Sequence, residues 1–142
     1  MTDIHPYPSL AAARALLEAA QLPTADLTPD HCEHFFYQGP LAAPTGLVGL
    51  ELFGDVALLR SLAVSPTAQG SGMGSALLEH AEDYARSARV KTLYLLTTTA
   101  EEFFDRRGYA RTAREAAPTA IRTTREFAGI CPASSAFMSK PL

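Results

Sequence analysis

Residues 62–75 read Leu62-Ala63-Val64-Ser65-Pro66-Thr67-Ala68-Gln69-Gly70-Ser71-Gly72-Met73-Gly74-Ser75, and they indicate a strand, a glycine-rich turn and the start of a helix. The three glycines permit positive φ and let a ligand approach the backbone closely. Free N–H groups at the start of a helix favour an anion. This stretch therefore predicts an anion-binding loop, with a tight strand-to-helix turn that binds nothing as the alternative.

The two common phosphate-binding motifs do not fit this loop. A P-loop needs a lysine followed by serine or threonine after its second glycine, and the first lysine of the chain is Lys91. A dinucleotide-binding loop needs the pattern G-x-G-x-x-G. The third glycine position holds Ser75 or Leu77, depending on the register. A diphosphate held without either motif remains as the expected ligand group.

Two strands precede the loop. Apolar residues predict a strand over Leu47–Phe53 and another over Val56–Val64, joined by a tight reversal at Gly54-Asp55. Alternation along the second strand would place every other side chain on one face. That face would carry Val56, Leu58, Arg60, Leu62 and Val64.

A helix and a further strand follow the loop. An apolar stripe predicts a helix over Met73–Arg89, and its opposite face carries Glu82 and Arg86 with the i,i+4 spacing of an ion pair. Val90 to Thr97 then has the composition of a buried strand. The order strand, loop, helix, strand predicts an α/β domain.

Shorter patterns complete the chain. Thr99 and Glu102 match a capping box at the start of a short helix, which Gly108 is suited to end. Pro118 suits the first turn of another helix, which would run to about Ala128. The remaining predicted elements are a helix over residues 9–20 capped by Ser9, and strands within residues 2–7, 33–37, 109–114 and 133–140.

Three segments together resemble the GNAT superfamily of acetyl-CoA-dependent N-acetyltransferases. Residues 69–74 match its Q/R-x-x-G-x-G/A loop, and residues 62–66 match its L-x-V-x-P strand end. Residues 103–109 are similar to its F-Y-x-x-x-G-F segment. The resemblance implies an α/β fold with a mixed, mostly antiparallel central sheet. Neighbouring strands of that sheet would splay apart after Val64, with helices on both faces.

The resemblance also implies acetyl-CoA as co-substrate, bound between the splayed strands. Backbone groups of Leu62 and Val64 would bind its pantetheine arm, as a peptide adds to a strand edge. N–H groups in the glycine loop would cradle the pyrophosphate. Thr97 sits where many relatives carry asparagine, so its hydroxyl would bond the co-substrate or water, unless it is simply a strand-end threonine. The implied contacts are Leu62, Ala63, Val64, Gln69, Gly70, Ser71, Gly72, Met73, Gly74, Ser75, Thr97 and Phe104.

The catalytic set that the resemblance implies is incomplete. Acetyl transfer needs a neutral amine and a proton, or other stabilisation, for the departing thiolate. Many relatives use a tyrosine for the second task, but this sequence has Phe104 there, and a phenyl ring has no proton to donate. Glu51 is the nearest sequence candidate for a base acting through water, with His34 and Tyr37 as weaker candidates.

Arg60 is the only charged residue on its predicted strand, and a charge among apolar neighbours needs a partner. It either pairs with Glu51 across the hairpin or binds an anionic group of the substrate. Arg122, on the late helix, is a second candidate because the family often builds its acceptor pocket there. The predicted acceptor is therefore a small amine that bears an anionic group.

Composition limits the remaining function classes. The chain has 142 residues, 47% hydrophobic and 19% charged, which fits one globular domain over residues 1–142. Its net charge of −3 disfavours nucleic acid as a partner. No membrane span or leader pattern is found, so the expected location is cytoplasmic. Cys32 and Cys131 are expected to be free thiols, and the four histidines form no metal-binding signature.

The leading prediction is an N-acetyltransferase that acts on a small amine and uses no metal. A homodimer is the assembly considered beside the monomer. Residues 95–104, 120–127 and 131–132 also resemble the small GNAT proteins associated with arsenic-resistance operons. That resemblance implies arsenic or xenobiotic resistance as the context. Two alternatives stay open: a GNAT-like module that binds CoA without catalysis, and a metalloid-responsive protein that uses its two thiols.

Overall fold

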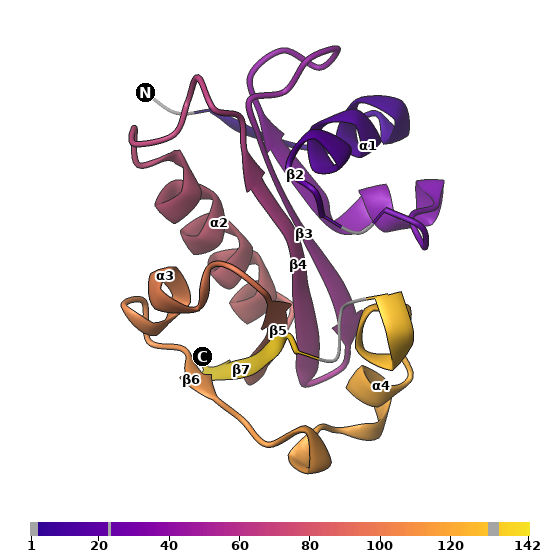
Figure 1. The fold of residues 1–142 in the computed structure, drawn as a ribbon. Coiled ribbons are helices and arrows are strands. Elements are labelled where there is room, and N and C mark those ends of the chain that lie inside the picture. Colours follow the sequence, from indigo (N-terminus) through magenta and orange to yellow (C-terminus); the bar gives the residue numbers. More distant parts are fainter. Residues whose placement is uncertain (1–2, 23, 131–133) are drawn as a thin grey trace.

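The computed structural model describes residues 3–22, 24–130 and 134–142 (Figure 1). Its strands are β1 (Ile4–Pro6), β2 (Phe35–Gln38), β3 (Gly46–Phe53), β4 (Val56–Val64), β5 (Thr92–Thr97), β6 (Ala110–Arg111) and β7 (Ala136–Pro141). Its α-helices are α1 (Leu10–Ala19), α2 (Met73–Ser87), α3 (Glu101–Asp105) and α4 (Thr119–Arg122), with shorter helical turns η1 (Pro29–His34), η2 (Arg114–Ala116) and η3 (Glu126–Ile130). None of the described helices is long and apolar enough to cross a lipid bilayer.

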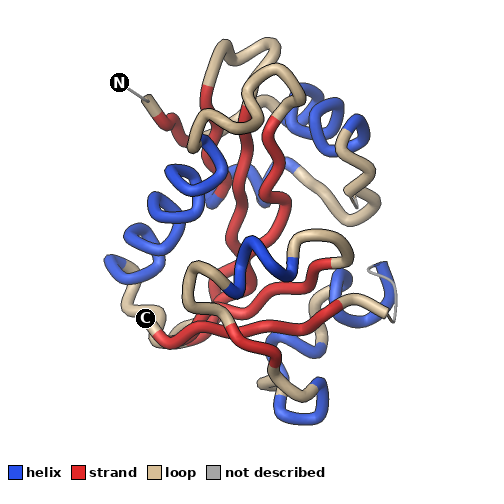
Figure 2. Tube along the Cα trace, turned by 60° about the vertical axis from the view of Figure 1, so that its left-hand side comes forward, coloured by secondary structure: helices blue, strands red, loops and turns tan. Residues whose placement is uncertain are grey.

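The strands form one sheet in the order β1-β2-β3-β4-β5-β7-β6. Neighbouring strands are antiparallel except β4 and β5, which are parallel. Helices α2 and α3 cover one face, and α1, α4 and η3 lie on the other (Figure 1, Figure 2). The predicted α/β fold is confirmed, as are the strands at β3 and β4 and the Ser9 cap of α1.

Strands β4 and β5 stay paired over a short length. Their parallel register runs from Val56↔Thr92 to Leu58↔Tyr94, and beyond it β5 continues beside β7 as far as Thr97. The strands therefore separate at Leu58. The resemblance to the GNAT superfamily placed this separation after Val64, which is wrong because the parallel pairing already ends at Leu58.

A β-bulge turns β4 away from β5. The register with β3 shifts so that Ser61 and Leu62 face the single residue Val48, and Ser61 takes a φ of 61°. Such a bulge bends its strand and increases the local twist. It also exchanges the two faces, because Leu58 packs in the core near α4 while Leu62 packs in the core beneath α2. The predicted common face for Leu58, Arg60 and Leu62 is therefore wrong beyond Arg60.

Three apolar clusters hold the helices on the sheet. The largest, beneath α2, includes the fully buried Leu77 and the strand residue Leu59. A second, between α1 and the sheet, includes Leu17 and Phe35. The third includes Ile121 of α4. Burial of such side chains is the main source of stability for the walls around the separated strands.

The polar face of α2 differs from the prediction. Glu82 is only 5% exposed and accepts hydrogen bonds from the Tyr109 hydroxyl and the Lys140 ammonium, each at 2.9 Å. Arg86 pairs instead with Asp83 at 3.0 Å. The predicted Glu82–Arg86 pair is wrong because β7, distant in sequence, brings a cation to Glu82.

The start of α3 also differs from the prediction. Ala100 rather than Thr99 occupies the N-cap, with no side-chain cap on the helix. The Ala100 N–H donates to the Thr97 hydroxyl at 3.0 Å, so the loop is held from β5 and the capping box is wrong. Gly108 follows the helix with a φ of 94°, as predicted.

The helix predicted from Pro118 to about Ala128 is broken. α4 ends at Arg122, and the chain restarts as η3 where the Thr124 hydroxyl accepts the Phe127 N–H at 3.3 Å. A threonine side chain that bonds the backbone in this way competes with a continuous helix. The predicted break at Pro132 and strand start at Ala133 lie outside the described residues, and β7 begins at Ala136.

We expect Gly49→Ala to destabilise the protein, because an added Cβ would lie 2.2 Å from a Phe35 ring carbon in a buried core. Overpacking of this kind typically costs about 1–3 kcal/mol. Gly129→Ala is the matched control, since its Cβ meets nothing within 4 Å. Urea denaturation of both variants tests this expectation. Equal unfolding free energies for the two variants would contradict the tight Phe35–Gly49 contact.

Candidate active site

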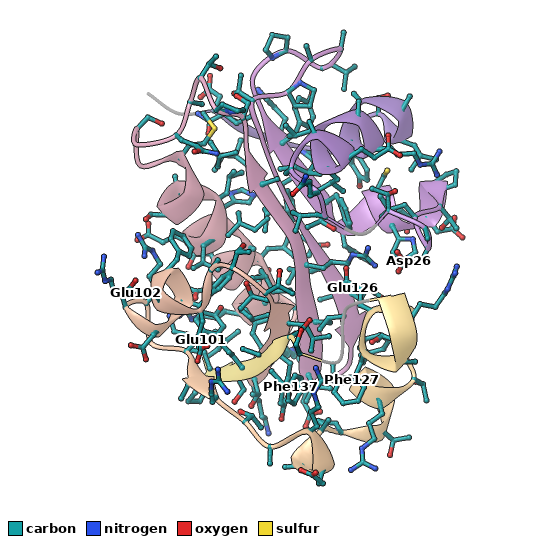
Figure 3. All side chains as sticks on the ribbon, viewed as in Figure 1. Asp26, Glu101, Glu102, Glu126, Phe127 and Phe137 are labelled. Atoms are coloured by element: carbon teal, nitrogen blue, oxygen red, sulfur yellow. The ribbon has the colours of Figure 1, made fainter. Side chains whose placement is uncertain are left out.

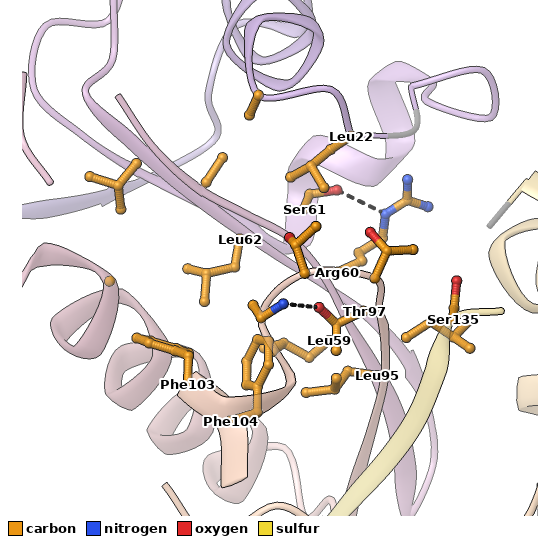
Figure 4. Close-up of a pocket in the computed structure, with 18 of the residues that line it drawn as sticks. Leu22, Leu59, Arg60, Ser61, Leu62, Leu95, Thr97, Phe103, Phe104 and Ser135 are labelled. Carbon is orange, nitrogen blue, oxygen red and sulfur yellow. Dashed lines mark hydrogen bonds between the residues drawn. The ribbon is translucent and has the colours of Figure 1, made fainter. Parts of the chain in front are cut away.

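A cleft of about 1140 Å³ opens where β4 and β5 separate. Leu62 of β4 and Thr97 of β5 face it from opposite sides, and Phe104 of α3 lines one end (Figure 4). Leu22 from the loop after α1 and Ser135, directly before β7, line the cleft away from α3. The predicted contacts that line the cleft are Leu62, Ala63, Val64, Gln69, Gly74, Thr97 and Phe104.

The glycine loop presents open backbone beside the cleft. Gly72 precedes α2 with a φ of 85°, and Gly70 has a φ of 82°. A Cβ at either position would meet nothing within 4 Å, so the left-handed backbone, and not packing, is what favours glycine there. The first N–H groups of α2 lack intrahelical partners. They are therefore available to an anion, as the sequence predicted.

Side chains of the loop hold it against the end of β4. Gln69 Nε2 donates to the Val64 carbonyl at 3.1 Å, and the Ser71 hydroxyl donates to the Ala68 carbonyl at 2.5 Å. These bonds shape the loop without any ligand. The other predicted loop residues lie beside the cleft rather than among its lining: Gly70, Ser71, Gly72, Met73 and Ser75.

Arg107 is a cleft residue that the sequence analysis missed. Its guanidinium donates to the Ser75 hydroxyl at 2.6 and 3.1 Å and lies 3.7 Å above the centroid of the Phe103 ring. Arg106 lines the same end. Two adjacent arginines directly before Gly108 were the available signal. Arg107 thus adds positive charge next to the glycine loop, while Arg106 is paired with Glu102.

The tyrosine side chains offer no proton donor within the cleft. Phe104 is 6% exposed and packs edge-on against Phe103 and Tyr109. The Tyr109 hydroxyl is absent from the lining and donates to Glu82. Burial and the Glu82 carboxylate raise the pKa of Tyr109 far above its usual value. Tyr37 lies on β2, against His5. The described residues therefore leave Phe104 without a tyrosine substitute.

Arg60 lies at the centre of a buried ion cluster beside the cleft. Its Nη1 donates to Asp26 at 2.5 Å and to Glu51 at 2.9 Å, and its Nη2 donates to Asp26 at 2.9 Å. Glu126 lies 3.2 Å from Nη2, and Nε donates to the Ser61 hydroxyl at 3.1 Å. Figure 3 shows Asp26 and Glu126 on the same side of β3 and β4. Every guanidinium nitrogen therefore faces an oxygen of the protein.

The cluster holds three carboxylates and one guanidinium. The pKa values of two of these carboxylates, Asp26 and Glu126, shift in opposite directions. Burial alone would raise the pKa of Asp26, but the hydrogen bonds and charge of Arg60 lower it below its usual value. For Glu126 burial dominates and, with repulsion from Asp26 and Glu51, raises the pKa to about 7 despite Arg60. Glu126 therefore exchanges its proton near neutral pH.

Of the predicted acceptor and base residues, only Arg60 is among the described residues that line the cleft. Arg60 pairs with Glu51, as one alternative held, and it has no free donor for a substrate anion. Glu51 lines a separate hollow of about 250 Å³, so the structure does not bring it to the cleft as a base. His34 bonds the Tyr84 hydroxyl, also outside the cleft lining. Arg122 is exposed and donates to the backbone carbonyl of residue 115.

The same hollow brings together the donor atoms of Asp26, His31 and Glu51 within 4.8 Å of one another. Both carboxylates already bind Arg60, and the His31 Nδ1 lies 3.1 Å from the Thr28 N–H, which donates to it. The carboxylate oxygens are therefore already bound to Arg60, and the His31 nitrogen is bound to the backbone N–H at the start of η1.

Comparison with known proteins gives a family match and several similar folds. Residues 8–109 match the model of the acetyltransferase (GNAT) family. The amino-acid acetyltransferase of Ralstonia nicotianae is 46% identical over 48 residues, which are 34% of this chain and 11% of that protein. The chain thus spans about a tenth of the length of that curated relative.

Two solved structures illustrate the similarity of fold. N-acetylglutamate synthase from Neisseria gonorrhoeae, complexed with coenzyme A and N-acetyl-glutamate, superposes with a TM-score of 0.81 at 26% identity, over 100% of this chain and 35% of that one. A GNAT-family acetyltransferase from Staphylococcus aureus Mu50 gives a TM-score of 0.79 at 16% identity, over 100% and 99% of the two chains. The second similarity shows the fold alone.

We expect Arg60→Met to destabilise the protein strongly. The substitution removes the positive charge that three neighbouring carboxylates share inside the protein. Breaking a buried ion pair in this way costs about 3–5 kcal/mol. Arg111→Met is the matched control, since its pair with Glu101 is largely exposed and such pairs contribute little. The measurement is the urea unfolding free energy at pH 7. Similar losses in both variants would show that Arg60 is not a buried anchor.

We expect Glu126→Gln to become more stable than the wild type as pH rises. The folded-state pKa of Glu126 is raised from 4.5 to about 7, so the folded protein binds this proton more tightly than the unfolded chain. Its stabilisation is complete below about pH 4.5 and disappears as pH rises through about 7.

Glutamine stays neutral, so the difference in melting temperature between variant and wild type should grow by several degrees from pH 5 to pH 8. Glu115→Gln, at an exposed position, is the control and should show no such trend. A constant difference across this range for Glu126→Gln would overturn the assignment.

Proposed function

The chain belongs to the acetyltransferase (GNAT) family, and on this premise we propose that it transfers the acetyl group of acetyl-CoA to the amine of a small molecule. The observation that carries the proposal is the cleft between the separated β4 and β5, with the glycine loop at its edge. The gonococcal relative, crystallised with coenzyme A, has the same fold. The Ralstonia relative, named an amino-acid acetyltransferase, supports an amine as acceptor.

In this proposal each part of the co-substrate meets a group of suited chemistry. The pyrophosphate lies on the N–H groups that begin α2, with Arg107 and Arg106 adding positive charge at the same end. The pantetheine arm, which has amide groups like a peptide, bonds the edge of β4 that β5 leaves unpaired beyond Leu58. Phe104 packs against its apolar part.

The amine nitrogen attacks the thioester carbonyl carbon, the C–S bond breaks, and the nitrogen loses a proton while CoA leaves as a thiolate. The titratable side chains among the described cleft residues are Arg60, Glu102, Arg106 and Arg107. Arg60 is held in its ion cluster, and Glu102 is exposed and paired with Arg106. The acceptor therefore binds as the neutral amine, and water takes up its proton. The thiolate leaves without a protein acid.

A second candidate function is a module that binds CoA without transferring the acetyl group. The observation that favours it is Phe104, which stands where many family members carry a tyrosine acid. Release of CoA in the presence of a panel of small amines, followed with a thiol reagent, separates the two. Release above the rate without amine supports the transferase. Tight acetyl-CoA binding with no release from any amine supports the module.

The metalloid-responsive alternative has less support. Cys32 lies in η1, outside the cleft lining, and burial raises the pKa of its thiol, which disfavours the thiolate that binds metalloids. Cys131 lies outside the described residues. The arsenic-resistance context, the homodimer, the single domain over residues 1–142 and the cytoplasmic location remain predictions.

We expect Gly72→Asp to weaken acetyl-CoA binding, because it places a carboxylate beside the pyrophosphate site and a side chain on left-handed backbone. Gly72→Asn is the matched control, since asparagine has a similar shape, tolerates this backbone and carries no charge. Calorimetry should show about tenfold weaker binding, or more, for Asp than for Asn. Equal affinities for the two folded variants would remove the loop from the binding site.

A further inference from the structure

We infer that Ser61 is a catalytic residue whose hydroxyl donates a hydrogen bond to the thioester carbonyl oxygen of acetyl-CoA while the amine attacks. This inference rests on the proposed acetyl transfer and adds a residue to the chemistry of the same cleft. Three observations carry it: the backbone conformation of Ser61, the hydrogen bond that holds its oxygen, and its place along β4.

The backbone of Ser61 is unusual for its residue type. Ser61 lies in the bulge of β4 and has a φ of 61°, in the left-handed region. Residues other than glycine seldom adopt this region, and those that do are concentrated at functional sites. Ser61 is half-buried and lines the cleft, where Figure 4 shows its side chain between Leu22 and Arg60. The bulge thus places a hydroxyl in the wall of the cleft.

One hydrogen bond fixes the Ser61 oxygen. Arg60 Nε donates to Ser61 Oγ at 3.1 Å, as the dashed line in Figure 4 marks, while Asp26 and Glu51 hold the rest of the guanidinium. No acceptor for the Ser61 hydroxyl hydrogen is found within the described parts of the chain. A hydroxyl whose oxygen accepts a hydrogen bond becomes a better donor itself. Ser61 therefore offers a fixed oxygen and a hydrogen that is available to a ligand in the cleft.

The order of the groups in acetyl-CoA brings the thioester to this hydroxyl. In the proposed function the pyrophosphate lies at the start of α2, next to the glycine loop that follows β4 at Val64. The pantetheine arm then runs along β4 away from that loop, and the thioester is its last group. Ser61 precedes Val64 by three residues, or about 10 Å along a strand. The thioester carbonyl therefore reaches the part of β4 that carries Ser61.

The carbonyl oxygen gains negative charge during the reaction. The amine nitrogen bonds to the carbonyl carbon, and the electron pair of the C=O bond moves onto the oxygen. A donor that is already in position stabilises this oxygen without reorganisation. The electron pair then returns, the C–S bond breaks, CoA leaves as a thiolate, and water takes the proton of the amine. Ser61 keeps its own proton throughout, and Arg60 acts as a positioning residue for it.

Ser61→Ala tests the contact through the kinetics of CoA release with an amine that the wild type acetylates. We expect kcat to fall about 10- to 150-fold, as for the loss of a hydrogen bond to a charged group. The KM for the amine should stay close to the wild-type value, because the hydroxyl serves the carbonyl oxygen. An unchanged kcat would overturn the inference. A higher KM for the amine at unchanged kcat would also overturn it, since it would place the hydroxyl on the acceptor.

Ser134→Ala is the matched control, because it removes an exposed hydroxyl outside the cleft lining. It should keep the wild-type kcat, and an equal loss in both variants would count against Ser61. Melting temperatures establish that each variant is folded at the assay temperature. If Ser61→Ala does not fold, Ser61→Gly replaces it, because glycine adopts positive φ without steric cost and also lacks the hydroxyl. A wild-type kcat in Ser61→Gly would then overturn the inference.

Calorimetry gives a comparison that does not need turnover and decides the matter if no amine releases CoA. CoA lacks the acetyl carbonyl, so Ser61→Ala should weaken acetyl-CoA binding about 2- to 13-fold and leave CoA binding unchanged. An equal effect on the two ligands, or none on either, overturns the inference while binding in the cleft stands. Failure of acetyl-CoA to bind the wild type overturns the proposed function instead, so the two failures are distinguishable.

Discussion

The buried guanidinium of Arg60 joins three parts of the chain that are distant in sequence. It binds Asp26 in the loop after α1, Glu51 on β3 and Glu126 in η3, while its own backbone lies in β4 beside the bulge. The loop after α1 also lines the cleft. The position of that wall relative to β4 thus depends on one ion cluster, whose stability in turn depends on charge balance and not on apolar packing alone.

The bulge and the ion cluster act on the same short length of β4. The bulge at Ser61 moves the strand away from β5 and opens the cleft, and the Ser61 hydroxyl accepts a hydrogen bond from Arg60 Nε. The bulge and the buried contacts on both faces of the sheet thus shape the β4 wall of the cleft together.

The cleft has two ends of different character. Arg107 gives one end positive charge beside open backbone N–H groups, which suits a phosphorylated co-substrate, whereas Arg106 at that end is paired with Glu102. Away from α3, Arg60 is the charged side chain among the described lining residues, and its charge is balanced by Asp26 and Glu51. With Phe104 where a tyrosine acid is usual and Tyr109 bound to Glu82, the described residues of this protein contribute to the proposed reaction mainly by positioning two reactants.

The sequence by itself determined the features that arise from neighbouring residues. The strand–glycine loop–helix order and the hairpin at Gly54 were evident from local pattern, because φ preferences and periodicity are properties of a short segment. The missing tyrosine at Phe104 followed from the resemblance to the GNAT superfamily. Tertiary structure alone decided that Arg60 also binds Asp26 and Glu126, that Glu82 is buried and that Ser135 lines the cleft. Asp26 lies 34 residues from Arg60, and Lys140 lies 58 from Glu82. Contacts across such separations depend on how the sheet twists and where β4 bulges, and no spacing within one segment encodes that geometry.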